Sequence, residues 1–431
     1  MAGKDIDMQE VVNDFLYTNK IILCKENKSF YKYSSSRGVW VRLDDIEFKK
    51  EIDKYINSCQ YGLEWDSYTI EYISRLSSIK AVYMDAMDTS RRHIVLGNGV
   101  YDLESMEFGK FSEKLMATYA LPFNYDAGAE CPVYDSFIEG ISSGSRAVAD
   151  TLNEVLGCAI AGTNMAKKLV YLVGSGANGK STYEEVLRMA AGKEYTTDVP
   201  VSDINGRNAF KRSLLMHSKL NLVHELDKKV TLENLFSANI KKIVTGEKID
   251  AEIKYGDSYF FKPEFMLVIA GNHLPAINSV PQDSILRRYL VIDFKGDFTG
   301  SRRDEGILRK MEGECPGIFN RGIEGLKRLE ANNCTYSCQG LSDRYIKDRI
   351  NEAFPLNGFI DGCITGCAGS KVFYTELGEC YSRWCGRNGL YPAGNRDGMS
   401  RELLNAVRKK GLQVSTGKSN GKRYIKGIKI I

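Results

Sequence analysis

Apolar residues recur along the chain with two different periods, which predict strands in some segments and helices in others. Two alternating runs around a Ser-Arg-Gly turn predict a strand pair over 29–43, and helical spacing follows over 47–56. A second strand–turn–strand pattern over 93–104 turns at a Gly-Asn-Gly triplet. Helical periodicity returns over 133–165. The first third of the chain is therefore expected to combine strands and helices.

The middle of the chain alternates short apolar runs with helical segments. This order over 169–294 predicts a parallel sheet covered by helices on both faces. Helical spacing continues over 303–330. From 356 onward, further helical segments precede a hairpin over 411–431 with a Gly/Ser/Asn-rich tip. Helices followed by such a hairpin predict a winged-helix module.

A glycine-rich stretch after the first apolar run of this middle region carries the strongest chemical signal. It fits the GxxxxGK[ST] pattern, with a strand expected before it and a helix after it. Glycines let successive backbone N–H groups point at phosphate oxygens, and a helix N-terminus adds partial positive charge. We expect Lys180 to reach the β- and γ-phosphates of a nucleotide and Ser181 to ligate Mg²⁺. The expected phosphate-binding set is Gly174, Ser175, Gly176, Ala177, Asn178, Gly179, Lys180, Ser181 and Thr182. The alternative is a glycine-rich turn that fits by chance.

Polar residues that follow two later apolar runs are candidate partners of this loop. The run over 219–227 ends in carboxylates, of which Glu225 is the first choice to hold Mg²⁺ and polarise the attacking water, and Asp227 the second. Another run ends at Asn272, whose neutral amide can bind the γ-phosphate or that water. A solvated strand-end acid and an ordinary turn asparagine are the alternatives.

Two further features bear on assembly and on a polyanionic partner. Arg287 and Arg288 precede the next apolar run, where an arginine supplied to a neighbouring subunit would couple catalysis to assembly. Two alternating runs over 242–261 predict a β-hairpin whose tip carries Lys254 and Tyr255, which can grip phosphate and stack on a base or sugar. A surface arginine pair and a solvated hairpin tip are the alternatives.

Composition changes this picture only locally. The 431 residues carry a net charge of +4, and no apolar run is long enough to cross a membrane. The N-terminus has no signal-peptide pattern, so the 11 cysteines are expected as reduced thiols in a cytosol. Residues 401–431, however, hold nine Lys or Arg and one acid. This excess predicts DNA binding by the C-terminal hairpin through Lys418, Lys422 and Arg423.

Cysteine and histidine positions give only weak signs of metal binding. The cysteine spacings are looser than the usual two-residue zinc knuckle, and the last four cysteines fit apolar helical positions equally well. The four histidines are scattered, so each is expected only to pack or to contact solvent. The cysteine pairs are Cys334-x3-Cys338, Cys363-x3-Cys367 and Cys380-x4-Cys385.

Taken together, these motifs resemble a superfamily 3 helicase. They are most similar to the C-terminal half of phage and plasmid primase–helicases and of the poxvirus primase–helicase. The motifs stand in the order of that family: phosphate loop, acidic strand end, hairpin, Asn272 strand and arginine pair. The stretches LGNGVYDLESMEFGKFS and YSRWCGRNGLYP resemble the segments that precede and follow the ATPase in those proteins.

The resemblance implies an AAA+ ATPase in a homo-hexameric ring. Such a ring uses ATP and Mg²⁺ to translocate 3′→5′ on single-stranded DNA and to part forked DNA, with Asn272 as sensor 1. It also implies a protein of a phage or mobile element in the bacterial cytoplasm, or of a virus in the host cytoplasm, without a membrane partner. About 90 residues before the Gly-Asn-Gly turn are too few for the family's primase domain. We therefore expect no primase activity from this chain. Two alternatives stay open: it is a fragment of a primase–helicase, or it acts beside a separate primase or initiator.

The predicted fold class is α/β: an AAA+ P-loop ATPase with a parallel sheet, preceded by an α+β domain and followed by a winged-helix domain. The predicted units are an N-terminal domain (1–132), an ATPase domain (133–300) with a helical lead-in (133–165), a helical linker or lid (301–355) and the winged helix (356–431).

Two other functions remain open at this point. An ATP-switched replication initiator or loader would bind and remodel origin DNA without processive unwinding. A packaging ATPase would require a nuclease domain with clustered acids after the ATPase. The sequence of 301–431 shows no such cluster.

Overall fold

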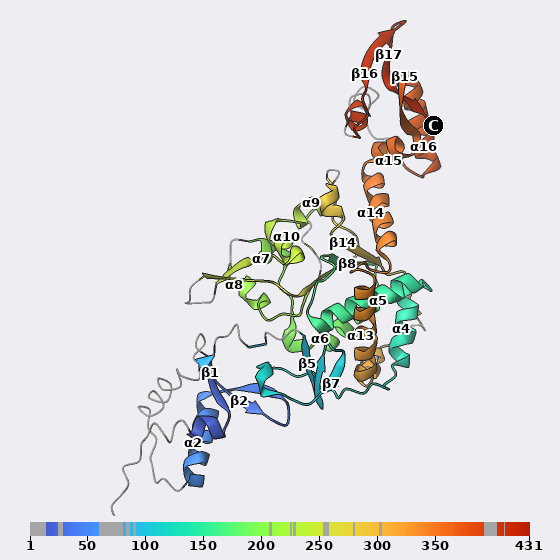
Figure 1. Ribbon diagram of the computed structural model, residues 1–431. Coiled ribbons are helices and arrows are strands. Elements are labelled where there is room, and N and C mark those ends of the chain that lie inside the picture. Colours follow the sequence, from blue (N-terminus) through green and yellow to red (C-terminus); the bar gives the residue numbers. More distant parts are fainter. Residues whose placement is uncertain are drawn as a thin grey trace, which may run out of the picture.

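The protein is elongated, with a central sheet between an N-terminal part and a C-terminal unit (Figure 1). The computed structural model describes residues 14–24, 29–59, 81–82, 87–88, 92–206, 209–224, 226, 230–252, 258–278, 281–300, 304–391, 403–408 and 410–431. The C-terminal unit projects from the central body at the end of α14 (Gln339–Ala353). Among the described helices, none combines the length and the apolar character needed to cross a bilayer.

The N-terminal part contains two small sheets. The first has the order β3-β2-β1-β4 and packs against α2, which begins with a capping box in which Asp44 and Glu47 bond each other's backbone N–H. The second is the antiparallel meander β5-β6-β7, whose Ile94 and Tyr101 join the core of the central body. The elements are β1 (Ile21–Cys24), β2 (Ser29–Ser34), β3 (Val39–Leu43), α2 (Asp45–Cys59), β4 (Ala81–Val82), β5 (His93–Leu96), β6 (Gly99–Asp102), β7 (Glu107–Gly109) and η3 (Glu113–Leu115).

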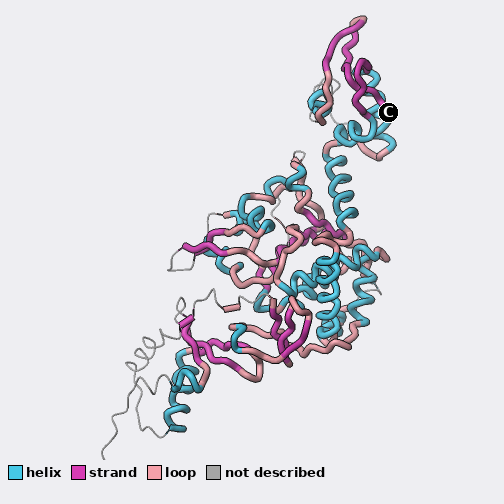
Figure 2. Tube along the Cα trace, viewed as in Figure 1, coloured by secondary structure: helices cyan, strands magenta, loops and turns pink. Residues whose placement is uncertain are grey.

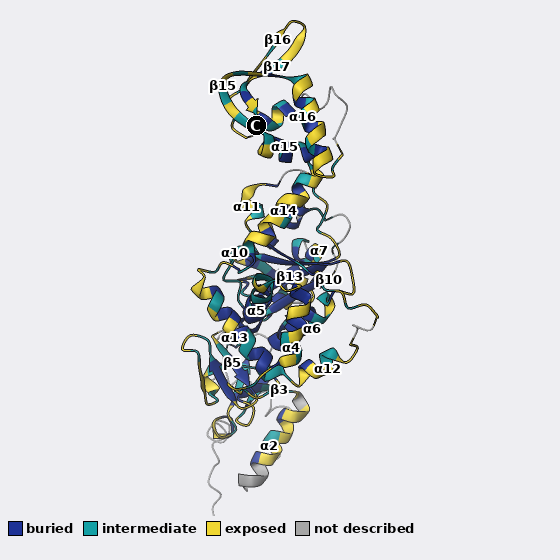
Figure 3. Cartoon of the chain, turned by 90° about the vertical axis from the view of Figure 1, so that its right-hand side faces the viewer, coloured by how far each residue is buried: buried dark blue, intermediate teal, exposed yellow. Residues whose placement is uncertain are grey.

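The central body is built on a five-stranded, fully parallel sheet of order β14-β8-β13-β10-β9. Its three middle strands are buried apart from the last residue of β10, as expected for a sheet covered on both faces (Figure 3). The predicted parallel sheet is therefore confirmed. The strands are β8 (Leu169–Val173), β9 (Thr196–Thr197), β10 (Leu220–His224), β13 (Met266–Gly271) and β14 (Tyr289–Asp293).

Alternate residues of these strands face two different helical layers. One layer packs on Val170 and Leu172 and comprises α4 (Pro132–Ser142), α5 (Arg146–Ala161), α6 (Lys180–Ala191), α12 (Ile307–Glu312) and α13 (Cys315–Ala331). The other packs on Leu169 and Tyr171 and includes α7 (Val201–Asn205), α9 (Leu232–Leu235), α10 (Ala238–Thr245) and α14. Short elements connect them: η4 (Lys193–Tyr195), α8 (Ala209–Arg212), η5 (Ser213–Leu215) and α11 (Asp283–Leu286).

The hairpin predicted over 242–261 is wrong at its start. Residues up to Thr245 belong to α10, because Ile240, Ile243 and Val244 are buried at helical spacing. Gly246, at φ 74°, ends the helix in the left-handed conformation that favours glycine. The hairpin itself is shorter and consists of β11 (Ile249–Glu252) and β12 (Ser258–Phe261), which pair antiparallel.

The C-terminal unit is a three-stranded antiparallel sheet of order β15-β17-β16 with helices on one face. The predicted terminal hairpin is confirmed as β16 (Ser415–Ser419) and β17 (Lys422–Ile430), which extends beyond the helices (Figure 2). Strand β15 (Ile364–Phe373) was not predicted, because three of its residues are Gly or Ser and only part of it alternates. The helices are α15 (Pro355–Cys363), α16 (Tyr374–Arg387) and a turn of helix at 403–408.

Candidate functional site

The phosphate loop joins β8 to α6 in a conformation that depends on glycine. Gly176, Ala177 and Gly179 all have positive φ, at 104°, 48° and 84°. A Cβ at Gly179 would lie 2.5 Å from the Cγ2 of Ile141 and would also be strained by that φ. The loop residues from 175 to 177 are exposed, so their backbone can reach a ligand. This is the arrangement expected of a loop that surrounds an anion.

Asn178 holds the loop from within. Its side chain is buried, and its Nδ2 donates a hydrogen bond to the carbonyl oxygen of Phe294 at 3.3 Å. Its Oδ1 accepts from the backbone N–H of Lys180 at 3.4 Å. A Cβ at Gly174 would lie 1.8 Å from that Nδ2, so this glycine makes room for the asparagine. Asn178 is thus placed to shape the loop, whereas the sequence prediction had grouped it with the phosphate ligands.

Lys180 brings the loop and the neighbouring strand together. Its Nζ donates to the carbonyl oxygens of Gly271, at 2.8 Å, and Gly174, at 3.2 Å. It also lies 3.4 Å from the Oδ1 of Asn272. Lys180 and Asn272, which are 92 positions apart, therefore meet where β8 and β13 end. The carboxyl ends of parallel strands are the usual position of ligands in such sheets.

A cavity of about 1080 Å³ opens beside this point. Its polar lining includes Lys180, Ser181, Thr182 and Asn272. Its other walls come from α4, α12 and the segment between β14 and α12. The apolar side chains among them are Val133, Phe137, Phe298, Ile307 and Leu308, and the charged ones are Asp304, Glu305 and Lys310. The cavity thus offers both hydrogen-bonding groups to an anion and apolar surface to a planar ring.

The first acid expected to hold Mg²⁺ comes directly after β10. Glu225 and Asp227 lie outside the described residues, but β10 ends at His224, which pairs in register with Ala270 of β13. The chain therefore leaves β10 next to Gly271 and Asn272. Ser181, whose side chain lines the cavity, is the described residue expected to ligate the ion.

Next to this strand end lies a buried carboxylate that sequence reasoning missed. Glu184 is one helical turn beyond Lys180 and is 3% exposed. Its Oε2 lies 2.8 Å from the Nδ1 of His224. Burial raises the pKa of Glu184 above its ordinary value, and the nearby His224 and Lys180 oppose that shift. The expectation that His224 only packs or contacts solvent is therefore wrong. Two consecutive glutamates at 184 and 185 gave no sign of which one turns inward.

The arginine pair is not brought to the cavity of its own subunit. Arg287 and Arg288 immediately precede β14, and their carbonyl oxygens accept hydrogen bonds from the Nζ of Lys168 and the N–H of Leu169. Because β14 and β8 are parallel, both arginines lie at the amino end of the sheet, whereas the loop lies at the carboxyl end. A five-residue strand separates the two edges by about 16 Å.

The predicted hairpin tip cannot be placed, because Lys254 and Tyr255 lie outside the described residues. The base of the hairpin is anchored by Ile249, Ala251 and Phe261. These side chains are buried in the core on the same side of the sheet as α10 and α14. In the C-terminal unit Lys418 and Arg423 form a cross-strand pair. Lys422 pairs with Ser419, so its side chain lies on the other face of the hairpin. The three predicted basic residues therefore divide between two faces.

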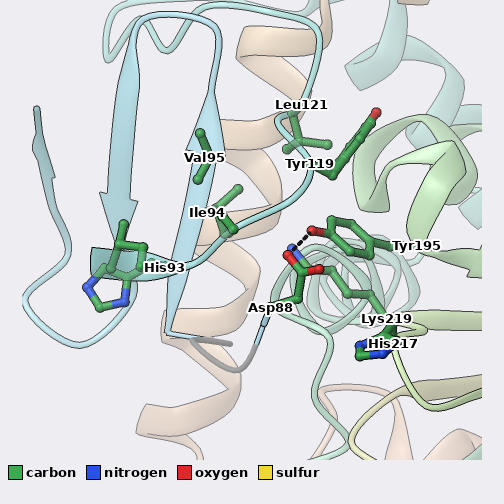
Figure 4. A pocket seen from close by; sticks show the side chains of 11 residues that line it. Asp88, His93, Ile94, Val95, Tyr119, Leu121, Tyr195, His217 and Lys219 are labelled. Carbon is green, nitrogen blue, oxygen red and sulfur yellow. Dashed lines mark hydrogen bonds between the residues drawn. The ribbon is translucent and has the colours of Figure 1, made fainter. Parts of the chain in front are cut away.

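A second cavity, between the N-terminal meander and β9, is too small for a nucleotide. Its volume is about 30 Å³, enough for one or two water molecules. Asp88 bonds the hydroxyl of Tyr195 at 2.8 Å, and the Nζ of Lys219 lies 4.8 Å from the centroid of that ring (Figure 4). Burial, followed by the nearby Asp88, raises the pKa of Tyr195. These contacts attach the N-terminal part to the edge of the sheet.

No described residues form a group of three or more His, Cys, Asp or Glu side chains positioned for a metal ion. Ten of the cysteines, including the six in the C-terminal pairs, are free thiols.

Comparisons with known proteins agree with the helicase resemblance. Residues 14–143 match the family described as D5 N terminal like, and residues 172–288 match a family of unknown function, DUF5906. The chain is 25% identical over 222 residues to a protein of Acanthamoeba polyphaga mimivirus named "Putative helicase L207/L206". That match covers 50% of this chain and only 23% of the viral protein.

Solved structures with this fold include the apo C-terminal region of NrS-1. Two of them cover 98% of this chain and 100% of theirs, with TM-scores of 0.50 and 0.51 and sequence identities of 9% and 10%. These likenesses concern the fold, while the D5 match and the mimivirus protein support the primase–helicase resemblance. None of them singles out superfamily 3 or the poxvirus protein.

Proposed function

We propose that this chain is an ATP-dependent replicative DNA helicase of the AAA+, superfamily 3 type, working as a homo-hexameric ring. The observation that carries the proposal is the meeting of Lys180 and Asn272 at the carboxyl edge of the sheet, beside a glycine-dependent loop and a cavity of about 1080 Å³. ATP matches both the polar and the apolar lining of that cavity. Its phosphates suit the loop, and its base suits the apolar wall.

In this proposal each residue has a defined task. The Nζ of Lys180 exchanges its backbone acceptors for oxygens of the β- and γ-phosphates. Asn272 orients the γ-phosphate or the attacking water. Ser181, with Glu225 as the first choice and Asp227 as the second, holds Mg²⁺, which neutralises charge on the phosphates.

The position of the arginines supports a ring. Arg287 and Arg288 lie at the opposite edge of the sheet from the loop, so neither serves the nucleotide of its own subunit without a large movement. Supplied to a neighbour, either one can stabilise the charge that develops during phosphoryl transfer. Catalysis then requires assembly.

DNA is the proposed second substrate. The hairpin β11–β12 leads directly into β13, which ends beside Asn272, so a change at the γ-phosphate can move Lys254 and Tyr255 at the hairpin tip. In a ring these tips grip one strand, and translocation is proposed to run 3′→5′. The C-terminal unit, proposed as a winged helix, adds phosphate contacts through Lys418, Lys422 and Arg423. A separate primase or initiator is the proposed partner in a phage, mobile element or virus.

A replication initiator or loader is the second candidate. The observation that favours it is the projection of the basic C-terminal unit at the end of α14, away from the central body, where it can contact duplex DNA by itself. Such a protein would remodel DNA upon ATP binding without sustained unwinding.

A strand-displacement assay separates these functions. The full chain, a labelled forked duplex, Mg²⁺ and ATP should release the labelled strand, and a non-hydrolysable ATP analogue should not support release. ATP hydrolysis and duplex binding without displacement would favour the initiator. Absence of ATP hydrolysis in assembled rings would contradict the helicase, and absence of ATP binding would contradict both.

Mixed rings test the arginine assignment. Subunits carrying Arg288→Ala and subunits carrying Lys180→Ala should each be inactive alone, yet mixing them should restore part of the hydrolysis at interfaces that pair two intact halves. Co-assembly is verified by pull-down of differently tagged subunits. Co-assembled rings as inactive as either variant alone would contradict catalysis in trans by Arg288, and repeating the mixture with Arg287→Ala tests its neighbour.

A further inference from the structure

The register of the C-terminal sheet separates two faces of different character. Val372 and Ile425 are cross-strand partners and are both buried against α15, α16 and residues 403–408. Side chains alternate along a strand, so Tyr424 and Lys426, on either side of Ile425, lie on the opposite face. We call this the outer face. Strand β15 contributes Phe373 and Lys371 to it, as partners of Tyr424 and Lys426.

The outer face is strongly basic. Strands β15, β16 and β17 contain no Asp or Glu. The exposed lysines on the outer face are Lys371, Lys422, Lys426 and Lys429. Figure 3 shows β16 and β17 as largely exposed. A basic surface without acids attracts a polyanion, and each phosphate that it neutralises releases a counterion.

An aromatic ring lies among these lysines. Tyr424 meets Phe373 edge to face, with ring centroids 6.2 Å apart. On β16 it lies opposite Gly417, where a Cβ would come within 2.5 Å of the tyrosine hydroxyl oxygen. The Nζ of the exposed Lys371 lies 5.0 Å from the centroid of the ring. The exposed Lys371 therefore covers one face of the Tyr424 ring from the solvent side. A nucleobase can take the place of that ammonium group, which is then free to pair with a phosphate.

We infer that the outer face binds single-stranded nucleic acid, with one base stacked on Tyr424 and the adjoining phosphates on Lys371, Lys422 and Lys426. A row of lysines beside an aromatic ring suits an unpaired strand, whose bases expose their flat surfaces. In a duplex those surfaces are already stacked, so Tyr424 would add nothing to the phosphate contacts. This inference rests on the proposed function and extends it: the C-terminal unit binds the unpaired strand of a fork.

The opposite face of the hairpin provides a matched control. Lys418 is also exposed, but it pairs with Arg423 on the face that carries Ile425. Loss of Lys418 removes one positive charge from the same hairpin and leaves the Tyr424 face intact. If binding depended only on total charge, loss of Lys418 and loss of Lys426 would weaken single-strand binding equally. If the strand lies on the outer face beside Tyr424, loss of Lys426 weakens single-strand binding more than loss of Lys418 does.

The test measures binding of the full chain, without nucleotide, to fluorescent oligothymidine, to an RNA oligonucleotide of equal length and to a blunt duplex. Tyr424→Leu should weaken single-strand binding by about 5- to 150-fold, the range for loss of one stacked base. Duplex binding should change by less than a factor of about two, and Tyr424→Phe should bind as the wild type does, because it keeps the ring. Gly417→Ala, which displaces the ring without changing the charge, should weaken single-strand binding in the same direction. Equal weakening of DNA and RNA would show that the stacking ignores the sugar.

Several outcomes would overturn the inference. These are unchanged single-strand binding by a folded Tyr424→Leu protein, equal losses for single strand and duplex, and a Tyr424→Phe protein as weak as Tyr424→Leu. The thermal unfolding midpoint verifies folding, and Gly417→Ala gives a second variant should Tyr424→Leu fail to fold. If the wild type displaces strands but Tyr424→Leu binds single strands as tightly as the wild type, this inference alone is refuted. Wild-type protein that binds no DNA at all would refute the proposed function as well.

Discussion

The phosphate loop and the C-terminal sheet differ in how side chains become functional. Around the loop, Asn178 and Lys180 donate to backbone carbonyls at the ends of buried strands, and Asn272 lies beside Lys180. Each group is held by others, and the loop conformation rests on residues with positive φ. In the C-terminal sheet only one face is buried, and the lysines of the other face are exposed.

This difference implies two kinds of sensitivity. In the proposed function, catalysis at the loop needs several groups in precise positions, so one substitution removes a whole arrangement. On the outer face, affinity accumulates from many weak contacts, so one substitution removes only its own share. The predictions that follow test this contrast, from the largest expected effect to the smallest.

The largest effect is expected at Lys180. Lys180→Ala should lower the rate of ATP hydrolysis by about 10²- to 10³-fold, the usual cost of removing one group that stabilises transition-state charge. The thermal unfolding midpoint should stay close to that of the wild type, because Lys180 supports no apolar packing. Turnover is measured by phosphate release. Lys193→Ala, which removes an exposed lysine just beyond α6, is the matched control and should hydrolyse ATP at the wild-type rate. Near-normal ATP turnover by Lys180→Ala would contradict the assignment of this loop as the ATP-binding loop.

An intermediate effect with a distinctive signature is expected at Glu184. Glu184→Gln should lower kcat about tenfold, the equivalent of one hydrogen bond to a charged group, with little change in KM. The reason is that its carboxylate ties α6 to His224 at the end of β10. Glu185→Gln, on the exposed side of the same turn, is the control. Equal kcat values for the two variants would contradict a role for the inward-facing carboxylate.

Glu184 should also make stability depend on pH. Because burial raises its pKa, the folded protein binds this proton more tightly than the unfolded chain. The resulting stabilisation is fully present below the ordinary carboxyl pKa and is lost as the pH rises through the raised, folded-state pKa. Glu184→Gln removes this titration. Its unfolding midpoint relative to the wild type should therefore rise as the pH increases above the ordinary carboxyl pKa. A difference that stays constant with pH would contradict the shift.

The smallest effect is expected for a single lysine of the outer face. Lys426→Ala should reduce the slope of log affinity against log salt by about 0.7 for single-stranded DNA, the value for one phosphate contact. Lys418→Ala should lower binding to single strands and to duplex alike, because it lies on the other face. Affinities are measured at several salt concentrations. Identical single-strand to duplex ratios for the two variants would remove the distinction between the faces.

Sequence alone identified the features whose conformation depends on a few consecutive residues. The glycine-rich loop could be predicted because its backbone conformation is one that neighbouring glycines permit. The parallel sheet could be predicted because buried strands are continuous apolar runs. The terminal hairpin is readable from its turn residues. The start of the other hairpin was misread, because a short helix and a strand at 238–252 have similar apolar content and only packing distinguishes them.

Tertiary structure decided everything that depends on which elements become neighbours. Glu184 turns inward and meets His224, 40 positions away, because α6 packs next to β10. Arg287 and Arg288 face away from the loop because β14 runs parallel to β8. Lys418 and Lys422 face opposite sides because the register fixes their partners. The sequence determined which chemical groups the protein has and which loop can hold a phosphate. Only long-range packing determined which groups meet, because side-chain burial and strand pairing are properties of distant segments together.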